Sequence, residues 1–304
     1  MDTKRMISFI VPVKDRDMKR IKNCVNSLKS DITGEVIIID YGSKKPIGKI
    51  PGVKVIRYNK NKIWNKAHAI NLGIKAAKYD YIGTVDCDII IPKEFLIATE
   101  KHLNSNSFIY NLNVKRIEIR DVSSDFKAML EKSTDWFGIK SRKYINHTAN
   151  GGIQIYPKKW ISDIGGADES LVYWGAIDND IFERAIMCGL SMVNINKPIL
   201  HQEHKYKKEE HLPIKEQTNA LIIRFEKGKY LDKMFKYNKY LRNCGKWGLN
   251  KPNQNRFIKD DIKREAREEM DKIEAVEYMQ RFKKAVKLGK ASFTFKGQEV
   301  KIHK

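Results

Sequence analysis

The sequence lacks cysteine motifs and long apolar runs, and these absences exclude several classes of protein. Its four cysteines, at positions 24, 87, 188 and 244, form no CxxC or Cys/His spacing, which argues against a zinc module or a disulfide framework. No run approaches the roughly 18 apolar residues that a membrane helix needs. The first apolar stretch is short and soon followed by charges, unlike a signal peptide. We therefore expect a soluble, cytoplasmic protein.

Acidic residues are scarce beside basic ones. The chain has 37 Asp and Glu against 59 Lys and Arg, a formal net charge of +22. Residues 205–304 hold 27 Lys and Arg against 14 Asp and Glu, whereas residues 1–204 hold 32 against 23. This excess indicates either a solvated surface or an anionic partner, such as nucleic acid, an acidic membrane or a polyanionic glycan.

The first half of the chain alternates short β-rich runs with helical patterns, which predicts an α/β sheet. Hydrophobic residues make up 41% of the 304 positions, enough to form a core. Ala67, Ile70, Ile74 and Ala77 repeat at helical spacing. The predicted strands are residues 7–13, 35–40, 53–58 and 81–88, with helices ending near residue 28 and spanning 65–77.

Two carboxylates lie in the last of these runs, YIGTVDCDIIIP at residues 81–92. Asp86 and Asp88 are two positions apart, so their side chains would share a face of an extended strand. Like charges there are unfavourable unless a cation lies between them. Carboxylates suit Mg²⁺ or Mn²⁺, which also bind phosphates. The alternative is a water-exposed pair, because so short a motif recurs by chance.

Longer segments carry a resemblance to a known family. FIVPVKDRDMKRIKNCVNSL, EVIIIDYGS and NKAHAINLGIKAAKYDYIGTVDCDIIIP resemble the nucleotide-binding half of family 2 glycosyltransferases with the GT-A fold. NGGIQIYPKKWISDIGGADESLVYWGAIDNDIFERAIMCGL resembles the acceptor half of galactosyltransferases and chondroitin-polymerase-like enzymes. The resemblance covers residues 6–204. It implies a mixed sheet flanked by helices and an inverting, metal-dependent transfer from a UDP-sugar to an acceptor hydroxyl.

The resemblance implies a metal site. Asp86 and Asp88 match the DxD motif that would hold Mn²⁺ or Mg²⁺ against the diphosphate of the nucleotide sugar. His201, in ILHQEH, matches a histidine that completes this site in many relatives. His204 is a less well aligned alternative, and a histidine in such a loop is otherwise commonly a surface residue.

The resemblance also implies donor contacts. Asp40 matches the acidic residue that contacts uracil or ribose, although the family's Asp-Asp-Gly-Ser reads Asp-Tyr-Gly-Ser here. Lys66 matches a basic residue on the donor, with Trp64 close by. A cation at a helix start is unfavourable, so an anionic ligand explains Lys66 better than exposure does. Gly152, like Gly151 before it, indicates either close approach to the donor sugar or a bulge. Loop residues matched to the nucleoside are Pro12, Lys14 and Arg16.

Asp178, in YWGAIDNDIFERA, matches the catalytic base that takes the proton from the acceptor hydroxyl. Its other role would be to cap the following helix, and Asp180 could share either role. The glutamate common before the base is Ile177 here, so the acceptor can differ from the familiar amino sugar. Trp174, beside Gly175, would stack on an acceptor ring, close a lid over the donor or anchor the core.

After residue 204 the resemblance ends, and we expect a basic, mainly helical extension over residues 205–304. Residues 258–287 predict a helix, and the final segment, ASFTFKGQEVKIHK, predicts a hairpin. Residues 227–256 interleave basic residues with aromatic ones, including Trp247. That pattern suits a nucleic-acid groove, anionic lipid head groups, or a helical pair with buried aromatic residues.

Three functions remain open from the sequence. The first is an inverting glycosyltransferase that builds a glycan or lipid-linked saccharide. It would be cytoplasmic, either free or in peripheral contact with the membrane. The second transfers sugar to hydroxymethylated bases of viral DNA, which would suit the basic chain. The third is a non-catalytic, transferase-like binding module.

Overall fold

The computed structural model describes residues 5–60, 64–112, 114–117, 141–143, 152–169, 171, 177–202, 243, 247–252, 292–295 and 298–301. The chain divides into two compact units. The first comprises Met1–Tyr144, Ala149–Glu203 and Asn238–Asn253, and the second comprises Ile145–Thr148, His204–Tyr237 and Gln254–Lys304. The domain boundary expected after residue 204 stays a prediction.

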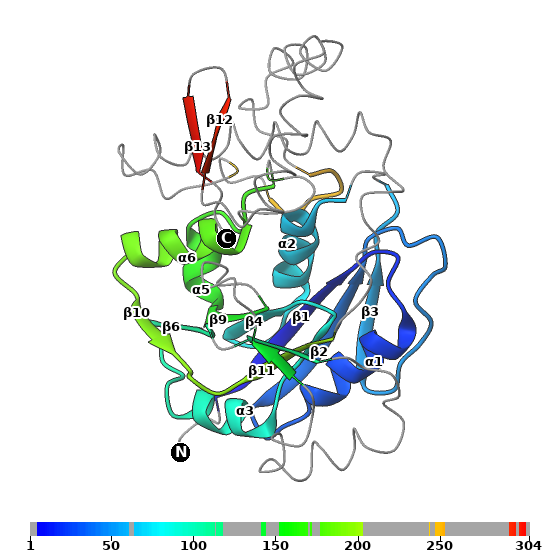
Figure 1. Cartoon of the computed structure of the whole chain (residues 1–304). Coiled ribbons are helices and arrows are strands. Elements are labelled where there is room, and N and C mark those ends of the chain that lie inside the picture. Colours follow the sequence, from blue (N-terminus) through cyan, green and yellow to red (C-terminus); the bar gives the residue numbers. More distant parts are fainter. Residues whose placement is uncertain are drawn as a thin grey trace. The chain divides into compact units, whose positions relative to one another are not determined.

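A seven-stranded mixed sheet forms the centre of the first unit (Figure 1). Its strand order is β10-β6-β9-β4-β1-β2-β3. Neighbouring pairs are parallel except those of β9, which runs antiparallel to both β4 and β6. The strands are β1 (Ile7–Val13), β2 (Thr33–Asp40), β3 (Val53–Arg57), β4 (Tyr81–Val85), β6 (Ser107–Tyr110), β9 (Ile153–Pro157) and β10 (Ser191–Asn194). The sequence predicted the first four of these within a few residues.

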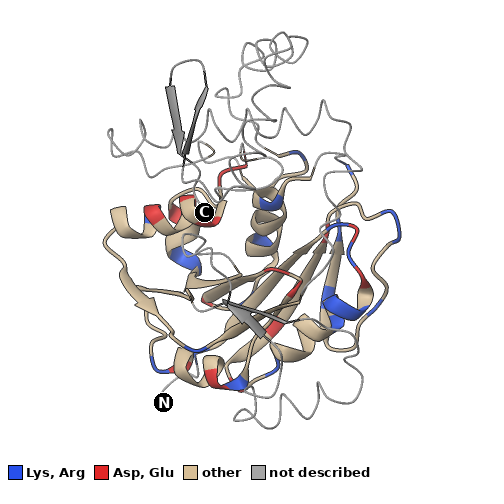
Figure 2. Cartoon of the chain, viewed as in Figure 1, with Lys and Arg blue, Asp and Glu red and all other residues tan. Residues whose placement is uncertain are grey.

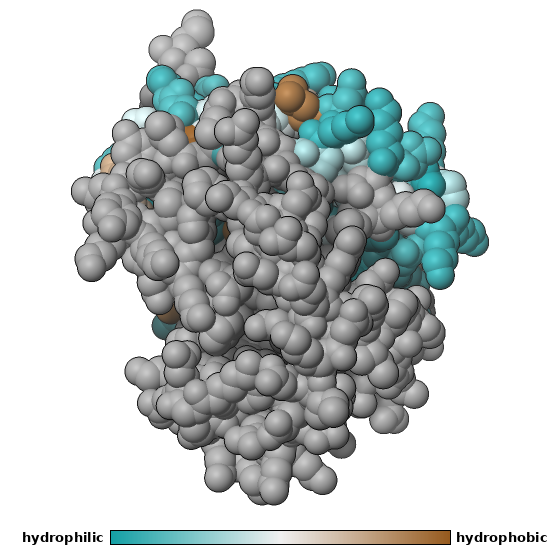
Figure 3. Space-filling model, turned by 90° about the horizontal axis from the view of Figure 1, so that it is seen from above, coloured by the Kyte–Doolittle hydropathy of each residue, from teal (hydrophilic) through white to brown (hydrophobic). Residues whose placement is uncertain are grey.

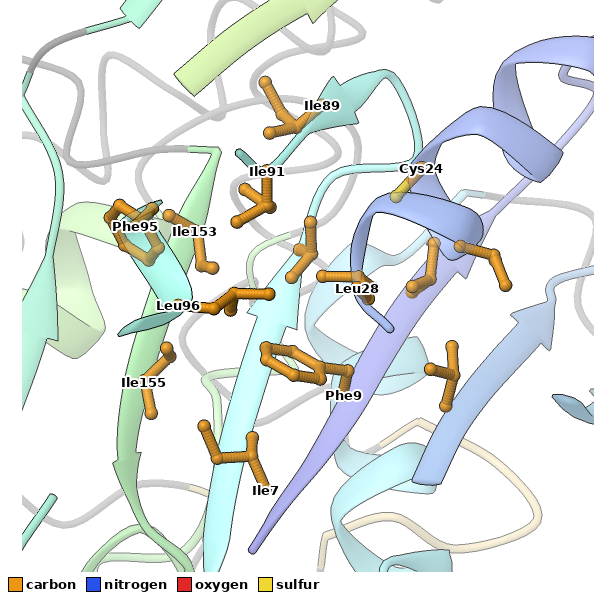
Figure 4. Close-up of a cluster of buried hydrophobic side chains, with 14 of the residues drawn as sticks. Ile7, Phe9, Cys24, Leu28, Ile89, Ile91, Phe95, Leu96, Ile153 and Ile155 are labelled. Carbon is orange, nitrogen blue, oxygen red and sulfur yellow. The ribbon is translucent and has the colours of Figure 1, made fainter. Parts of the chain in front are cut away.

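Helices cover both faces of this sheet (Figure 1). α1 (Met18–Ser27) and α3 (Lys93–Glu100) pack on one face, and α2 (Lys66–Ala76), α5 (Lys158–Asp163) and α6 (Ile177–Met187) pack on the other. Side chains alternate between the faces of a strand, so β1 supplies Phe9 and Val11 to the first core and Ile10 to the second. Figure 4 shows the first core, with Phe9 near Leu28, which follows α1, and near Leu96 of α3. The expected α/β architecture is confirmed.

A second sheet of four short strands has the order β5-β11-β7-β8. Its strands are β5 (Ile89–Ile90), β7 (Val114–Ile117), β8 (Ser141–Lys143) and β11 (Ile199–Gln202). In the second unit, β12 (Ser292–Phe295) and β13 (Gln298–Lys301) pair antiparallel, which confirms the predicted terminal hairpin. The helix predicted over 258–287 lies outside the described residues.

A buried polar network fixes α2 against the segment before α6. The Glu169 side chain accepts hydrogen bonds from Asn71 Nδ2, 2.8 Å away, and from the Gly248 main-chain N–H, 2.6 Å away. Asn71 also donates to the Ala167 carbonyl, and Asn243 donates to the same carbonyl. Satisfied buried networks of this kind rigidify the elements that they join.

Trp247 belongs to this packed region. The residue is only 6% exposed, and the Lys75 ammonium lies 3.7 Å from the centroid of its ring. Three alternatives were given for residues 227–256, and the burial of Trp247 agrees with the one that predicts buried aromatic residues. The other aromatic residues of that stretch lie outside the described residues.

The described surface is mainly polar. Figure 2 shows Lys and Arg on α1 and on the loop between β2 and β3. Seen from above, the described residues in view are mostly hydrophilic (Figure 3). Large exposed hydrophobic side chains among the described residues are Ile97, Leu112, Ile186 and Leu249. Within the same residues, no helix has both the length and the apolar character needed to cross a membrane.

Candidate active site

The site lies at one edge of the central sheet, where β1, β2 and β4 end. Because these strands are parallel, the loops after Val13, Asp40 and Val85 meet there. Antiparallel β9 begins at the same edge, with Ile153 opposite Val85. Ligands of open α/β sheets bind at this edge, so the topology gathers polar side chains where a ligand would lie.

Asp86 and Asp88 lie in a turn beyond β4. The strand ends at Val85, and the N–H of Ile89 donates to the Asp86 carbonyl at 3.0 Å. The expectation that both carboxylates extend the strand is therefore wrong, because the ladder with β9 stops at Val85. The turn gives the two side chains different partners: Asp86 meets Lys66, and Asp88 faces His201.

Lys66, the first residue of α2, lies between two carboxylates. Its Nζ is 2.7 Å from Asp86 Oδ1 and 3.1 Å from Asp178 Oδ2. Burial by itself lowers the pKa of Lys66, but Asp178 and Asp86 outweigh it and hold the pKa above its ordinary value. Asn65 fixes the start of the helix, because its side chain accepts from the His68 N–H at 2.9 Å. The sequence predicted an anionic ligand near Lys66, whereas the two anions that contact its ammonium in the structure are side chains of the protein.

Burial raises the pKa of Asp86 to about 6. Lys66 opposes this rise, while Asp178 and Asp88 add to it as like charges. The Asp86 side chain is still 35% exposed and that of Asp178 is 27% exposed, so a ligand can reach both carboxylates.

A shallow hollow lies over these groups. It is lined by four residues that the sequence predicted to bind the nucleotide sugar or the metal, and by the predicted catalytic base. Its walls are Pro12, Lys66, Thr84, Val85, Asp86, Gly152, Ile153, Gln154 and Asp178. The structure therefore brings together residues up to 166 positions apart, from Pro12 to Asp178, around one surface.

Asp178 lies in the first turn of α6, as predicted, where the helix dipole favours an anion. Its main-chain carbonyl accepts a hydrogen bond from Gln154 Nε2 at 2.8 Å. Gln154 is on β9 and is 1% exposed, so the start of α6 is tied to the central sheet.

Asp180, the second candidate base, points elsewhere. Its side chain is 1% exposed and forms an ion pair with Arg184, which is fully buried, at 2.8 Å. Arg184 also donates to the Gly166 carbonyl at 2.9 Å. Asp180 therefore pairs within α6, where Arg184 ties the helix to the preceding turn, and Asp178 is the aspartate that lines the hollow.

Asp88 and His201 lie side by side, with Asp88 Oδ2 3.8 Å from His201 Nε2. His201 reaches this position because β11 pairs antiparallel with β5, which follows the turn. Two carboxylates and an imidazole form a donor set that fits Mn²⁺ or Mg²⁺. Within the part of the chain that is described, no three His, Cys, Asp or Glu side chains converge as metal ligands, since Asp86 is turned toward Lys66.

A buried amide pair braces this corner. Gln202, which is 0% exposed, donates its main-chain N–H to the Asp88 carbonyl at 2.8 Å. Its side-chain oxygen accepts from Asn23 Nδ2 at 3.0 Å, and its side-chain nitrogen donates to the Arg20 carbonyl. These hydrogen bonds hold α1, β11 and the Asp88 turn in fixed positions relative to one another.

Asp40 is fully buried at the end of β2, and its carboxylate organises the next loop. It forms an ion pair with Arg57 at 2.5 Å and accepts from the N–H groups of Ser43 and Ile47. Burial opposes its ionisation, but these hydrogen bonds and Arg57 lower its pKa below the ordinary value. Its expected contact with uracil or ribose stays a prediction.

The loops after β1 and β2 are bound to each other. The Asp15 N–H donates to Ser43 Oγ at 2.9 Å, and the Lys44 N–H donates to Asp15 Oδ1 at 2.7 Å. Asp15 takes a left-handed backbone conformation, with φ 51°, that allows this exchange. Of the loop residues matched to the nucleoside, Lys14 is half-buried, and burial lowers its pKa against the opposing charges of Asp15 and Asp40.

Arg16 reaches toward the DxD turn. Burial raises the pKa of the Cys87 thiol, Asp88 raises it further, and Arg16 opposes both. A cation here would favour a bound diphosphate as well.

Gly152 has φ +105°, a conformation open mainly to glycine. Its carbonyl accepts from the Asp86 N–H at 3.0 Å, and an added Cβ would approach Ile199 Cδ1 at 3.2 Å. Gly152 thus joins β9 to the DxD turn.

Several predicted residues lie outside the described part of the chain: Gly151, Trp174, Gly175 and His204. Trp64 is described and half-buried, with its ring edge-on to Tyr41 at 5.5 Å.

Sequence reasoning missed Gln154, Gln202 and Asn23. Gln154 had a usable signal, because it is a polar residue inside the buried apolar strand IQIYP. Gln202 and Asn23 gave none, since they are 179 positions apart.

Comparison with known proteins identifies the family. Residues 8–165, just over half of the chain, match the family model Glycosyl transferase family 2, and residues 138–212 match N-terminal domain of galactosyltransferase. The chain belongs to glycosyl transferase family 2, which confirms the resemblance.

Relatives of this chain include a chondroitin synthase and a hyaluronan synthase. A chondroitin synthase of Escherichia coli is 25% identical over 249 residues, 67% of this chain and 36% of the relative. A hyaluronan synthase of Pasteurella multocida is 24% identical over 234 residues, 62% of this chain and 23% of the relative. The chain thus spans about a third or less of these relatives.

Solved structures to which the chain is similar include GalNAc-T7 with UDP, GalNAc and Mn²⁺. That structure is 14% identical, with a TM-score of 0.49, and the similarity covers 72% of this chain and 48% of the other.

Proposed function

We propose that this protein is an inverting, metal-dependent glycosyltransferase that moves a sugar from a UDP-sugar to an acceptor hydroxyl in glycan or lipid-linked saccharide synthesis. One observation carries the proposal: Lys66, Asp86 and Asp178 meet at one hollow at the carboxyl edge of the sheet. A cation for the diphosphate, a metal-binding carboxylate and a base are the groups that such a transfer needs.

Asp178 is the base of this proposal. It would take the proton of the acceptor hydroxyl while that oxygen attacks the anomeric carbon opposite the leaving diphosphate. Its carboxylate is 27% exposed at the hollow, and Gln154 holds its main chain. Asp180 takes no part in the chemistry, because its carboxylate is buried against Arg184.

Asp86, Asp88 and His201 would hold the divalent ion. When bound, the ion would neutralise the charge that develops on the leaving diphosphate. Lys66 adds a second positive charge at the phosphates, and Arg16 lies near the same turn. The paired loops after β1 and β2 would form the nucleoside wall.

The relatives support a glycan acceptor, because they are chondroitin and hyaluronan synthases. The described residues do not favour a nucleic-acid acceptor, since Trp247 is buried under Lys75 and offers no face for stacking. A peripheral membrane contact stays a prediction.

Calorimetric binding of UDP with and without Mn²⁺, on the native protein and on Asp88→Asn, tests the proposal. We expect binding that needs Mn²⁺ and that Asp88→Asn abolishes. UDP binding that is indifferent to both the metal and the substitution would refute metal dependence. A panel of sugar nucleotides, followed by NMR of the anomeric product, then tests the donor and the inversion.

A further inference from the structure

Lys66 engages two carboxylates that the reaction assigns to other partners. Its Nζ lies 2.7 Å from Asp86 Oδ1, and 3.2 and 3.1 Å from Oδ1 and Oδ2 of Asp178. Asp86 is a proposed metal ligand, and Asp178 is the proposed base. One ammonium group thus faces both the carboxylate meant for the metal ion and the carboxylate meant for the acceptor hydroxyl.

We propose that Lys66 is an exchangeable counter-ion: it competes with the divalent cation for Asp86 and covers Asp178 until a diphosphate draws the ammonium away. This inference rests on the proposed metal-dependent function and deepens it. The nucleotide would bind first through its negative charge, and its diphosphate would then release Asp86 and Asp178 from Lys66.

The competition follows from the position of the charges. Asp86 Oδ1 already accepts from Lys66, and a second cation on the same carboxylate would lie within a few ångströms of the ammonium. Repulsion between like charges is strong at such a distance in a partly buried site, where the Lys66 side chain is only 16% exposed. A phosphate oxygen is an alternative partner for the same ammonium.

Exchange would involve the side chain alone, because the backbone of Lys66 is fixed. Asn65 accepts from the His68 N–H, and its side-chain nitrogen donates to the Glu169 carbonyl at 2.7 Å. The long lysine stem can move its charge while the helix stays in place. Asp88, held by Gln202 and facing His201, keeps its place during the exchange.

The exchange predicts coupled binding of metal and nucleotide. Mn²⁺ alone should bind weakly, because it must displace Lys66 from Asp86. UDP should tighten Mn²⁺ binding, and Mn²⁺ should tighten UDP binding by the same factor. Removing the ammonium should raise the affinity for Mn²⁺ alone and shrink this coupling factor.

Mn²⁺ titration followed by electron paramagnetic resonance, without and with UDP, tests the inference on the full chain. The variants are Lys66→Met and Lys66→Gln, which remove the charge, and Lys66→Arg, which keeps it. Lys78→Met is the matched control, because Lys78 is exposed beyond the far end of α2 and its loss changes the net charge equally. Asp88→Asn reports whether the titrated site is the proposed one, and thermal unfolding checks that each variant is folded.

We expect both uncharged variants to bind Mn²⁺ about tenfold tighter than the native protein in the absence of UDP. Lys66→Arg and Lys78→Met should bind as the native protein does. Unchanged or weaker Mn²⁺ binding by the folded uncharged variants, alongside intact metal-dependent UDP binding, overturns the inference and leaves the proposed function standing. Absence of Mn²⁺ binding in every protein, with and without UDP, overturns both.

Discussion

The side-chain amide of Gln154 on β9 donates to the main-chain carbonyl of Asp178, 2.8 Å away, and so ties the start of α6 to the central sheet. The bond lies beside the hollow that both residues line. It fixes where the proposed base stands relative to Asp86, whose N–H is held by Gly152 at the start of the same strand.

Replacing Gln154 with Leu should lower turnover about tenfold while leaving UDP and Mn²⁺ affinity near native, because the base loses its support and the donor groups do not. UDP release from the active sugar nucleotide measures turnover, and calorimetry measures affinity. Equal losses in turnover and in UDP affinity would show that Gln154 supports the donor instead.

Asp178→Asn and Asp180→Asn form a matched pair that separates the base from its neighbour. Asp178→Asn should reduce UDP release by 100-fold or more and spare UDP binding, because a general base contributes about 10² to 10⁴. Asp180→Asn should cost about 3 kcal/mol of unfolding free energy, since it leaves Arg184 as an uncompensated buried charge.

Urea denaturation measures the stability of both variants, and folded Asp180→Asn should retain turnover. The assignment is reversed if Asp178→Asn keeps native turnover while folded Asp180→Asn loses it.

Gln202→Met should weaken Mn²⁺ binding by about tenfold or more, because it removes the amide that holds β11 and its His201 against α1. Groups that orient metal ligands typically contribute about 10-fold to 100-fold in affinity. Asn26→Ala, an exposed substitution on α1, is the control and should bind Mn²⁺ normally. Native Mn²⁺ affinity in a folded Gln202→Met protein would contradict the bracing role.

We expect the stability of the protein to depend on pH through Asp40. Its pKa is lowered from 3.8 in the folded protein, so its charge contributes stability above that value, and the contribution is lost as the pH falls through the lower folded pKa. The native protein should exceed Asp40→Asn in unfolding free energy by about 2 kcal/mol at pH 7, the size of charge-assisted hydrogen bonds, because the Arg57 left behind is 35% exposed. This difference in unfolding free energy should become smaller at about pH 3. Urea denaturation at both pH values measures it. An equal difference at the two pH values would show that the charge of Asp40 is not its source.

The sequence alone predicts the first four strands of the central sheet and several of the residues that line the hollow. Residues 7–13 form β1 as predicted, because seven consecutive apolar or small residues suit a strand buried on both faces. The burial of Ala67, Ile70 and Ile74 on α2 follows from their helical spacing. The DxD motif, Lys66 and Asp178 were predicted from motif and resemblance, and the hollow brings Asp86 of that motif together with Lys66 and Asp178.

The partner of each charged side chain depends on the tertiary structure. Asp86 and Asp88 are two residues apart, yet the end of the β4 ladder at Val85 turns them toward Lys66 and His201, 20 and 113 positions away. Asp178 and Asp180 share one helical turn, yet one lines the hollow and the other is buried against Arg184. Local sequence sets backbone conformation through short-range sterics and periodicity, whereas the direction and pairing of a buried charge depend on groups that long-range packing brings to it.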